Sequence, residues 1–149
     1  MSYANLRTGR YSIPAQAYLV TTVTQDRKPI FLNFWLARCA IAQLRRLHTQ
    51  GDVDSLAWVL MPDHLHWLFQ LTDGASLAKV MQRFKGCSAR AIHVSDPDQG
   101  SVWQANYYDR ALRTEENVRS VARYIIANPI RAGLVDKVGD YPHWDAVWV

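Results

Sequence analysis

The sequence predicts an α+β fold with the element order βαββαβ, one antiparallel sheet and a further helix near the C-terminus. Three observations predict it: short runs of β-branched and aromatic residues, apolar stripes at helical spacing, and a turn signal between the two central strands. The six elements fall at residues 18–24, 32–48, 56–61, 64–71, 77–93 and 102–113. This order indicates a ferredoxin-like sandwich, and we expect a single domain over residues 1–149.

The first half of the chain gives a strand and a helix. Residues 18–24 (YLVTTVT) are rich in strand-forming residues and end at a polar turn that contains Pro29. In residues 32–48 apolar side chains recur every three or four positions, and Asn33 is placed to cap the start of this helix. Gly51 is expected to end it, because glycine readily adopts the left-handed conformation found at helix ends.

Two central strands form the middle of the predicted sheet. After a turn at residues 52–55, strands 56–61 and 64–71 are separated only by Pro62 and Asp63. Proline and aspartate together are a tight-turn signal, so we expect the two strands to form an antiparallel hairpin.

A basic helix follows this hairpin, with Ser76 placed to cap its start. Gly86 costs this helix about 1 kcal/mol relative to alanine, which indicates a bend or close packing there. Residues 74–95 contain no Asp or Glu and four cations: Lys79, Arg83, Lys85 and Arg90. This clustering favours a surface that follows nucleic-acid phosphates, and a solvated helix face is the alternative.

A last long helix begins at Thr114, an N-cap followed by two acidic residues that the helix dipole favours. Pro129 is expected to stop it, and Gly133 marks a turn soon after. Tyr124 and Asn128 are four residues apart, so they share a helix face if the helix extends to the residue before Pro129. A buried core tyrosine and a helix-end asparagine are the alternatives.

Composition is that of an ordinary globular protein: 49% of the 149 residues are hydrophobic and 20% are charged. The apolar runs are far shorter than the roughly 18 residues of a membrane helix, and the first ten residues have no apolar core, so neither a membrane span nor a signal peptide is expected. Cys39 and Cys87 are expected to be reduced core thiols of a cytoplasmic protein. The net charge of +4 and the pI near 9.3 favour an anionic partner.

His64 and His66 are the first candidates for chemistry. Side chains alternate along a strand, so both imidazoles point to one face while Leu65 points to the other. Two imidazoles at this spacing can bind one divalent metal ion, and a pair of hydrogen-bonded strand histidines is the alternative.

Tyr124 and Asn128 extend the histidine pair to a candidate catalytic site. A tyrosine phenolate can cut a phosphodiester in a covalent step if cations or a metal ion stabilise the phosphate and the departing oxygen. His64, His66 and the amide oxygen of Asn128 would supply three nitrogen and oxygen ligands. Such a set suits Mg²⁺ or Mn²⁺ better than a structural zinc ion.

Several motifs resemble those of a known family. Residues 64–66 (HLH), preceded by residues 61–63 (MPD), resemble the histidine-hydrophobic-histidine motif of HUH single-strand DNA endonucleases. Further segments resemble the branch called REP-associated tyrosine transposases, and these lie at residues 9–14, 18–21, 103–104, 107–110 and 123–135. The likeness runs over roughly residues 9–142, whereas residues 141–144 (YPHW) depart from the Trp-Ser-Ser ending of this branch.

The resemblance implies a metal-dependent endonuclease and strand transferase that acts on single-stranded DNA folded into palindromic hairpins. It implies that Tyr124, on a C-terminal catalytic helix, is the nucleophile that forms a 5′-phosphotyrosine intermediate. It implies His64, His66 and Asn128 as ligands of Mg²⁺ or Mn²⁺, and no further cofactor. Hairpin phosphates would be bound by Arg7, Arg10, Lys79, Arg83, Lys85, Arg90, Arg110 and Arg131.

Other interpretations stay open. Tyr107 and Tyr108 are rival nucleophiles, ranked lower because only one of two neighbours on a strand can face a given site. Trp67 and Tyr108 are candidates to stack on unpaired bases, with core packing as the alternative. A non-catalytic hairpin DNA-binding module and a phosphodiesterase that uses water are rival functions. We expect no membrane and no obligate protein partner, with the chain acting as a monomer or a homodimer.

Overall fold

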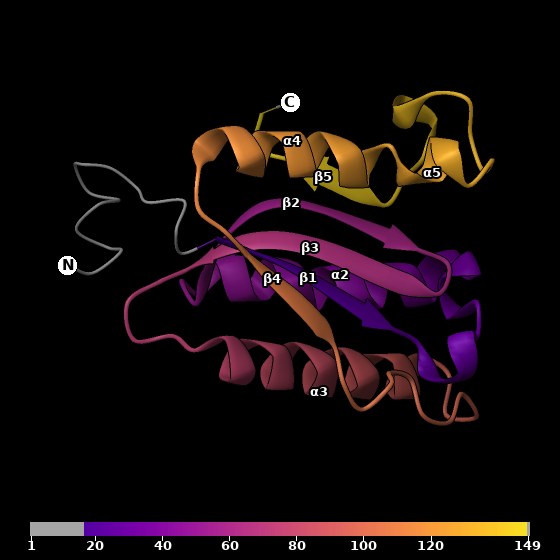
Figure 1. The fold of residues 1–149 in the computed structure, drawn as a ribbon. Helices are drawn as coiled ribbons and strands as arrows, with labels where there is room; N and C mark the ends of the chain where they lie inside the picture. The colour runs from indigo at the N-terminus through magenta and orange to yellow at the C-terminus, as the bar shows by residue number, and fades with distance from the viewer. Residues whose placement is uncertain (1–16, 149) are drawn as a thin grey trace.

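A computed structural model describes residues 17–148 of the chain (Figure 1). Its centre is a five-stranded antiparallel sheet with the strand order β4-β1-β3-β2-β5. The strands are β1 (Ala17–Val23), β2 (Val53–Met61), β3 (His64–Leu71), β4 (Tyr108–Leu112) and β5 (Trp144–Ala146). The first four strands have the order of a ferredoxin-like sandwich, so the predicted α+β fold is confirmed.

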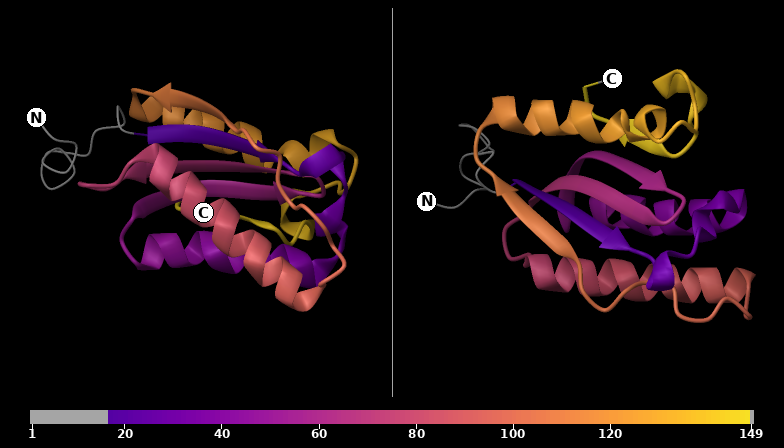
Figure 2. Two further views of the ribbon diagram at one scale, coloured as in Figure 1. Left: turned by 90° about the horizontal axis from the view of Figure 1, so that it is seen from below. Right: turned by 45° about the vertical axis from the view of Figure 1, so that its right-hand side comes forward.

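Helices cover both faces of the sheet, as Figures 1 and 2 show. On one face lie α2 (Phe34–Thr49) and α3 (Leu77–Ser95). On the other face lies α4 (Glu115–Ile126), which the short helix α5 (Asn128–Arg131) follows. Single turns of 3-10 helix occur at Gln25–Arg27, Ile30–Leu32 and Val138–Asp140.

Alternation along the strands directs side chains into two apolar cores, one on each face of the sheet. In β3, Leu65, Trp67 and Phe69 are buried beneath α2 and α3. Leu68, between them, is buried in the other core together with Val118 of α4. Each residue of β3 therefore has a defined face, and the even-numbered residues face α4.

Trp67 is fixed in the first core. Its ring lies 4.4 Å from the ring of Phe69 and 5.5 Å from that of Phe84, measured between centroids. Its indole nitrogen donates a hydrogen bond to the hydroxyl of Ser55 at 3.0 Å. The side chain is fully buried, so of the two interpretations of Trp67 core packing is confirmed and stacking on DNA bases is excluded.

The helix starts agree with the capping signals. The Asn33 side chain accepts hydrogen bonds from the backbone N–H groups of Trp35 and Leu36 at 3.0 and 3.1 Å. The Ser76 hydroxyl accepts one from Lys79 at 3.2 Å. Of the two interpretations of Gly86, close packing is wrong: a Cβ atom there would meet no other described atom within 4 Å.

Two strands, β2 and β4, differ from the prediction by more than one residue at their starts. β2 begins at Val53, because residues 53–55 pair with β3 before a register shift between Ser55 and Ala57. Such a shift places an extra residue in one strand and interrupts the alternation on which the prediction relied. β4 is shorter than expected, since residues 102–107 form only one isolated bridge, between Trp103 and Thr24.

The fifth strand was not predicted. β5 pairs with Ala57–Val59 of β2 at the edge of the sheet, and its three residues are too few to show an alternating pattern. Tyr141, just before β5, is buried and donates its hydroxyl proton to the carbonyl oxygen of Leu60 at 2.5 Å. The end of the chain therefore returns to the sheet.

The described part of the fold contains neither a membrane helix nor a disulfide. No helix within residues 17–148 combines the length and the apolar character that crossing a bilayer requires. Cys39 and Cys87 are both free thiols and are partly buried. The two apolar cores on either side of the sheet therefore account for how its layers are held together.

Candidate functional site

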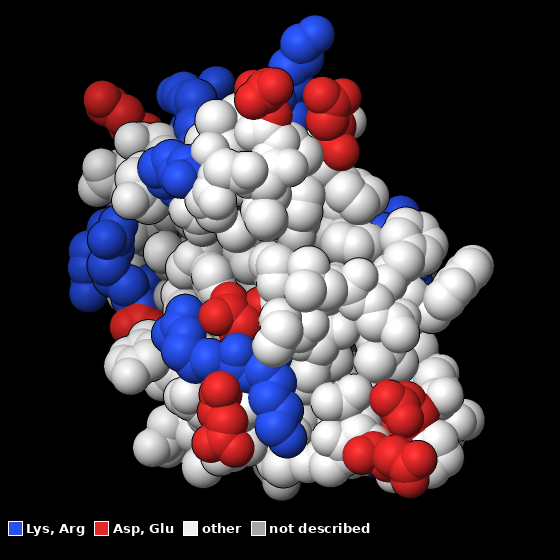
Figure 3. Space-filling view, turned by 90° about the vertical axis from the view of Figure 1, so that its right-hand side faces the viewer, with Lys and Arg blue, Asp and Glu red and all other residues white. Residues whose placement is uncertain are grey.

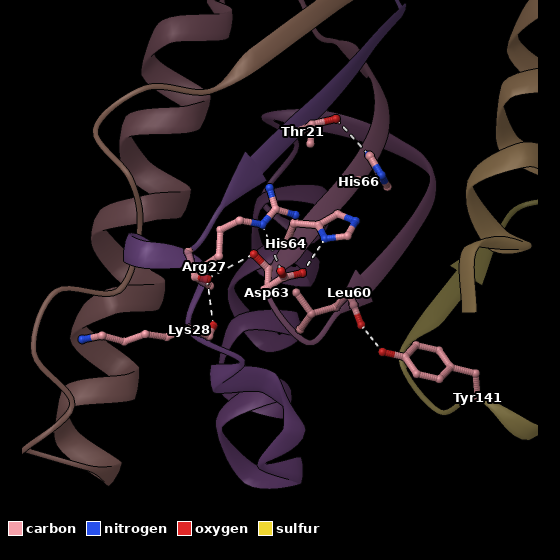
Figure 4. A network of polar contacts seen from close by, with 9 residues as sticks. Thr21, Arg27, Lys28, Leu60, Asp63, His64, His66 and Tyr141 are labelled. Carbon is pink, nitrogen blue, oxygen red and sulfur yellow. Dashed lines mark hydrogen bonds and ion pairs between the residues drawn. The ribbon is translucent and has the colours of Figure 1, made fainter. Parts of the chain in front are cut away.

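His64 and His66 lie at the start of β3 and point to the side of the sheet on which α4 packs (Figure 4). Their ring centroids are 4.8 Å apart and the rings are nearly perpendicular, at 79°. Leu65 between them is buried in the opposite core. The two imidazoles therefore form a pair on one face, as the strand alternation predicts.

Each imidazole is held through its Nδ1 atom. His64 Nδ1 donates to the Asp63 carboxylate at 2.8 Å, and the other oxygen of that carboxylate accepts from Arg27 Nε at 3.2 Å. His66 Nδ1 lies 2.8 Å from the hydroxyl of Thr21 on β1. Because both contacts use Nδ1, Nε2 is the nitrogen of each ring that is left for a ligand. Histidines that bind metals are commonly oriented in this way by a polar partner on the other nitrogen.

The surroundings of the pair keep one imidazole neutral and one carboxylate charged. Burial, followed by the charges of His64 and Arg131, lowers the pKa of His66 to about 4. Burial alone would raise the pKa of Asp63, but the hydrogen bond from His64 and the positive charge of Arg27 outweigh it and lower that pKa. At neutral pH His66 is thus an uncharged imidazole, the form that binds metals.

Tyr124 lies near the end of α4, on its exposed side. The helix begins at Thr114, whose hydroxyl accepts a hydrogen bond from the backbone N–H of Asn117 at 3.1 Å. It buries Val118 and Ile125 against the sheet, and this leaves the side chain of Tyr124 64% exposed. Tyr124 is therefore not a core tyrosine.

Asn128 is not a continuation of α4. That helix ends at Ile126, and Asn128 is the first residue of α5, whose first turn contains Pro129. The condition for Tyr124 and Asn128 to share one helix face is therefore not met, although the prediction that the helix stops before Pro129 is confirmed. Proline is well suited to the first turn of the new helix.

Arg131 nevertheless connects Tyr124 with Asn128. Its guanidinium carbon lies 3.7 Å from the centroid of the Tyr124 ring. It donates to the backbone oxygen of Tyr124 at 2.5 Å and to Oδ1 of Asn128. The same positive charge contributes to lowering the pKa of His66. One arginine therefore interacts with the tyrosine, with the asparagine and with the histidine strand.

The residues that could ligate a metal ion at this site are of mixed type. Among residues 17–148 no group of three or more His, Cys, Asp or Glu side chains is arranged to hold a metal ion. A metal ion bound by His64 and His66 therefore needs a different third ligand. The amide oxygen of Asn128, which now accepts from Arg131, is of the oxygen type that Mg²⁺ and Mn²⁺ prefer.

The cations predicted to bind DNA separate into groups. Arg7 and Arg10 lie outside the described residues. The cations of α3 lie on the face of the sheet opposite the histidines. Of these, Arg83 pairs with Asp52 at 2.6 Å.

The side chain of Lys85 forms hydrogen bonds within the fold, whereas that of Arg110 is exposed. The ammonium group of Lys85 donates to the carbonyl oxygens of Gln104 and Ala105 at 2.6 and 3.0 Å, and burial lowers its pKa. Arg110 is exposed on the edge strand β4. Of the predicted DNA-binding cations that the structure describes, Arg110 and Arg131 are therefore the ones on the face of the sheet that carries the histidines.

The end of the molecule at which β2 turns into β3 carries charges of both signs. Figure 3 shows Lys and Arg side chains along one flank of this end and near its middle, with Asp and Glu side chains among them. An anionic ligand at this end would therefore meet particular cations and not a uniformly positive surface.

Sequence reasoning missed the residues that orient the histidines. Asp63 was interpreted only as a turn residue, and Thr21 only as part of a strand. The strand alternation carried a signal for Thr21, since register pairs it with His66 on the same face. No local pattern signalled the contact between Arg27 and Asp63, because 36 residues separate them.

Comparison with known protein families identifies the family of this chain. A family model described as "Transposase IS200 like" matches residues 12–128, a span that includes both histidines, Tyr124 and Asn128. The chain belongs to the IS200-like transposase family. Members of a transposase family process DNA, so this chain has a transposase-type function.

Individual relatives of this IS200-like transposase agree with that assignment. The chain is 25% identical to the REP-associated tyrosine transposase of Escherichia coli strain K12 over 135 residues, which covers 89% of this chain and 78% of that protein. It is 29% identical to the ISDra2 transposase TnpA of Deinococcus radiodurans over 89 residues, or 55% of this chain and 62% of that protein.

The fold has a solved counterpart. A structure described as a REP-associated tyrosine transposase bound to a REP hairpin superposes with a TM-score of 0.69 at 23% identity, covering 91% of this chain and 79% of that one. At this identity the likeness shows that the two chains share a fold.

Proposed function

We propose that this transposase cuts and rejoins single-stranded DNA folded into palindromic hairpins, through a covalent bond between Tyr124 and a 5′ phosphate. His64, His66 and Asn128 would hold a Mg²⁺ or Mn²⁺ ion in this reaction. The proposal combines the transposase-type function of the family with the particular side chains at the start of β3 and the end of α4.

One observation carries the proposal: the Arg131 guanidinium lies on the Tyr124 ring while its charge acts on His66. Packing supports the same proximity, because α4 contacts β3 and α5 contacts β2, the strand that pairs with β3. We infer from this that the proposed nucleophile and the proposed metal ligands belong to one site that a single phosphate could reach.

The chemistry requires no reactant other than DNA. The Tyr124 hydroxyl oxygen would form a bond to phosphorus while the bond from phosphorus to the 3′ oxygen breaks. The phenolic proton passes to solvent and the 3′ oxygen takes up a proton, which leaves a 5′-phosphotyrosine and a 3′ hydroxyl. Attack by another 3′ hydroxyl reverses these changes and joins two strands. Arg131 is placed to stabilise negative charge on the phosphate.

The residues present fit a divalent metal ion. Both imidazoles are oriented through Nδ1, and His66 is neutral at physiological pH. A bound Mg²⁺ or Mn²⁺ would neutralise charge on the phosphate oxygens. Asp63 and Thr21 would keep the two imidazoles in the orientation that such a ligand set needs.

A hairpin substrate is supported by a relative and by the site. The structural counterpart described above is bound to a REP hairpin. In this chain, Arg110 and Arg131 offer phosphate contacts on the histidine face, and affinity should fall steeply as salt increases.

The decisive experiment is a search for the covalent adduct. A labelled hairpin oligonucleotide with unpaired extensions is incubated with the protein and Mn²⁺, and denaturing gels are examined for a protein-bound label. We expect an adduct with the wild type and with Tyr107→Phe, and no adduct with Tyr124→Phe. An adduct that persists in Tyr124→Phe refutes the assignment of the nucleophile.

The same experiment separates the rival functions. Cleavage without any adduct would indicate that water attacks the phosphate, as in a phosphodiesterase. Binding without cleavage, in either Mg²⁺ or Mn²⁺, would indicate a non-catalytic hairpin-binding module of the same fold.

A further inference from the structure

The edge strand β4 carries an aromatic side chain on the face of the histidines. Tyr108 of β4 is paired with Thr21 of β1, and Thr21 is paired with His66 of β3. Side chains of directly paired residues on neighbouring strands lie on the same face of a sheet. The Thr21 hydroxyl contacts the His66 ring, so Tyr108 completes a row of three residues across the sheet.

A second observation gives the same orientation for Tyr108. Leu112 lies four residues further along β4, and alternation places residues four apart on one face. Leu112 is buried in the core beneath α4. Tyr107, the neighbour of Tyr108, packs instead against the opposite core and has the Lys85 ammonium group 6.0 Å from its ring centroid.

This face of β4 is open to solvent at Tyr108 and Arg110. α4 packs against β2, β3 and β5, whereas the Tyr108 side chain is 71% exposed. Arg110, two residues further on and on the same face, is exposed as well. Two strand spacings, about 10 Å, separate the backbone of Tyr108 from that of His66.

An exposed aromatic ring beside a cation is the arrangement by which proteins bind unpaired nucleotides. The ring stacks on a base and the cation contacts the phosphates. A strand with one phosphate at the histidines that runs toward this edge of the sheet would have its neighbouring nucleotide above β1 and β4, where Tyr108 lies. We propose that Tyr108 stacks on an unpaired base next to the phosphate that is cut, and so helps to position the single-stranded part of the DNA.

This inference rests on the proposed function, because it takes the histidines as the place of the phosphate. It assigns to Tyr108 a binding role that depends on the ring and not on the hydroxyl. It therefore also separates Tyr108 from the role of nucleophile, which the sequence alone left open.

The test measures DNA affinity in chelator, so that no cleavage is needed. The probes are a fluorescent hairpin oligonucleotide with unpaired extensions of random sequence and the same hairpin without extensions. Tyr108→Ala should weaken binding of the extended hairpin by about 5- to 150-fold, the range that the loss of one stacked base corresponds to. Binding of the hairpin without extensions should stay unchanged.

Two further measurements identify stacking as the cause. Tyr108→Phe, the matched variant, keeps the ring and should retain both affinity and, in Mn²⁺, the covalent adduct. The slope of log affinity against log salt should be the same for Tyr108→Ala as for the wild type, because stacking releases no counterions. Melting temperatures of both variants check that the fold is intact.

The proposal is overturned if Tyr108→Ala binds the extended hairpin as well as the wild type does, or weakens both probes equally. It is also overturned if Tyr108→Phe loses as much affinity as Tyr108→Ala, or if the wild type binds neither probe. A wild-type protein that binds the extended hairpin through Tyr108 but forms no adduct would refute the proposed chemistry alone.

Discussion

The neutral His66 imidazole should make the protein less stable in acid. Burial, with the charges of His64 and Arg131, lowers the pKa of His66 from 6.5 to about 4 in the folded chain. The unfolded chain regains the ordinary pKa and therefore binds a proton more readily below pH 6.5. The stability that this residue contributes is thus complete above about pH 6.5 and is lost as the pH falls toward 4.

The size of the effect follows from the pKa difference. Each pKa unit corresponds to about 1.4 kcal/mol, so a shift from 6.5 to about 4 amounts to roughly 3 kcal/mol. This is a large part of the roughly 5–15 kcal/mol by which domains are stable. Burial of His143, followed by the charge of Arg38, lowers the pKa of that residue too and adds to the same trend.

The assay is urea unfolding followed by tryptophan fluorescence, with a chelator present, at several pH values from about 8, above the transition, down to about 4.5. Wild-type protein should lose free energy of unfolding below pH 6.5, and His66→Gln should show a loss smaller by up to about 3 kcal/mol. The two proteins are compared by the slope of the free energy of unfolding against pH. The absolute free energies are not compared, because the substitution itself alters packing. Equal slopes in the two proteins would show that His66 is not held neutral by the fold, and the reasoning would fail.

Three further predictions concern the site and the sheet edge. His64→Ala and His66→Ala should abolish cleavage of the labelled hairpin but retain hairpin binding, and loss of the folded circular dichroism spectrum would instead indicate structural histidines. Arg131→Met should lower the rate of adduct formation more than Arg131→Lys, since lysine keeps the charge but not the planar contacts with Tyr124 and Asn128; equal rates for both variants and the wild type would exclude this role. Tyr141→Phe should reduce the free energy of unfolding by about 1–3 kcal/mol by leaving a buried carbonyl without its donor, and an unchanged urea midpoint would contradict this.

The central hairpin could be predicted because its signals are local. The residues from Pro62 to Leu71 combine a turn pair with a run of strand-forming residues, and the alternation of side chains along any strand then places His64 and His66 on one face. The caps at Asn33 and Ser76 were also predictable, since a cap is a contact within four residues.

The elements that were missed depend on contacts distant in sequence. β5 is three residues long and exists because β2 offers an unpaired edge to it. Pro129 signalled the end of α4, but the contact from Arg131 back to Tyr124 depends on the direction that α5 takes after Ala127, which no local pattern gives. For Trp67 the sequence left base stacking and core packing open, and only the tertiary packing shows that the core is the right choice.

The return of the chain to the sheet restricts the movement of the segment that carries Tyr124. The segment that carries Tyr124 is attached at one end to β4 and at the other, through residues 127–143, to β5, and both strands belong to the same sheet. Two contacts hold the far end of this segment: the pairing of β5 with β2 and the hydrogen bond from the Tyr141 hydroxyl to Leu60. The segment that carries Tyr124 is therefore attached at both ends to the sheet of its own chain.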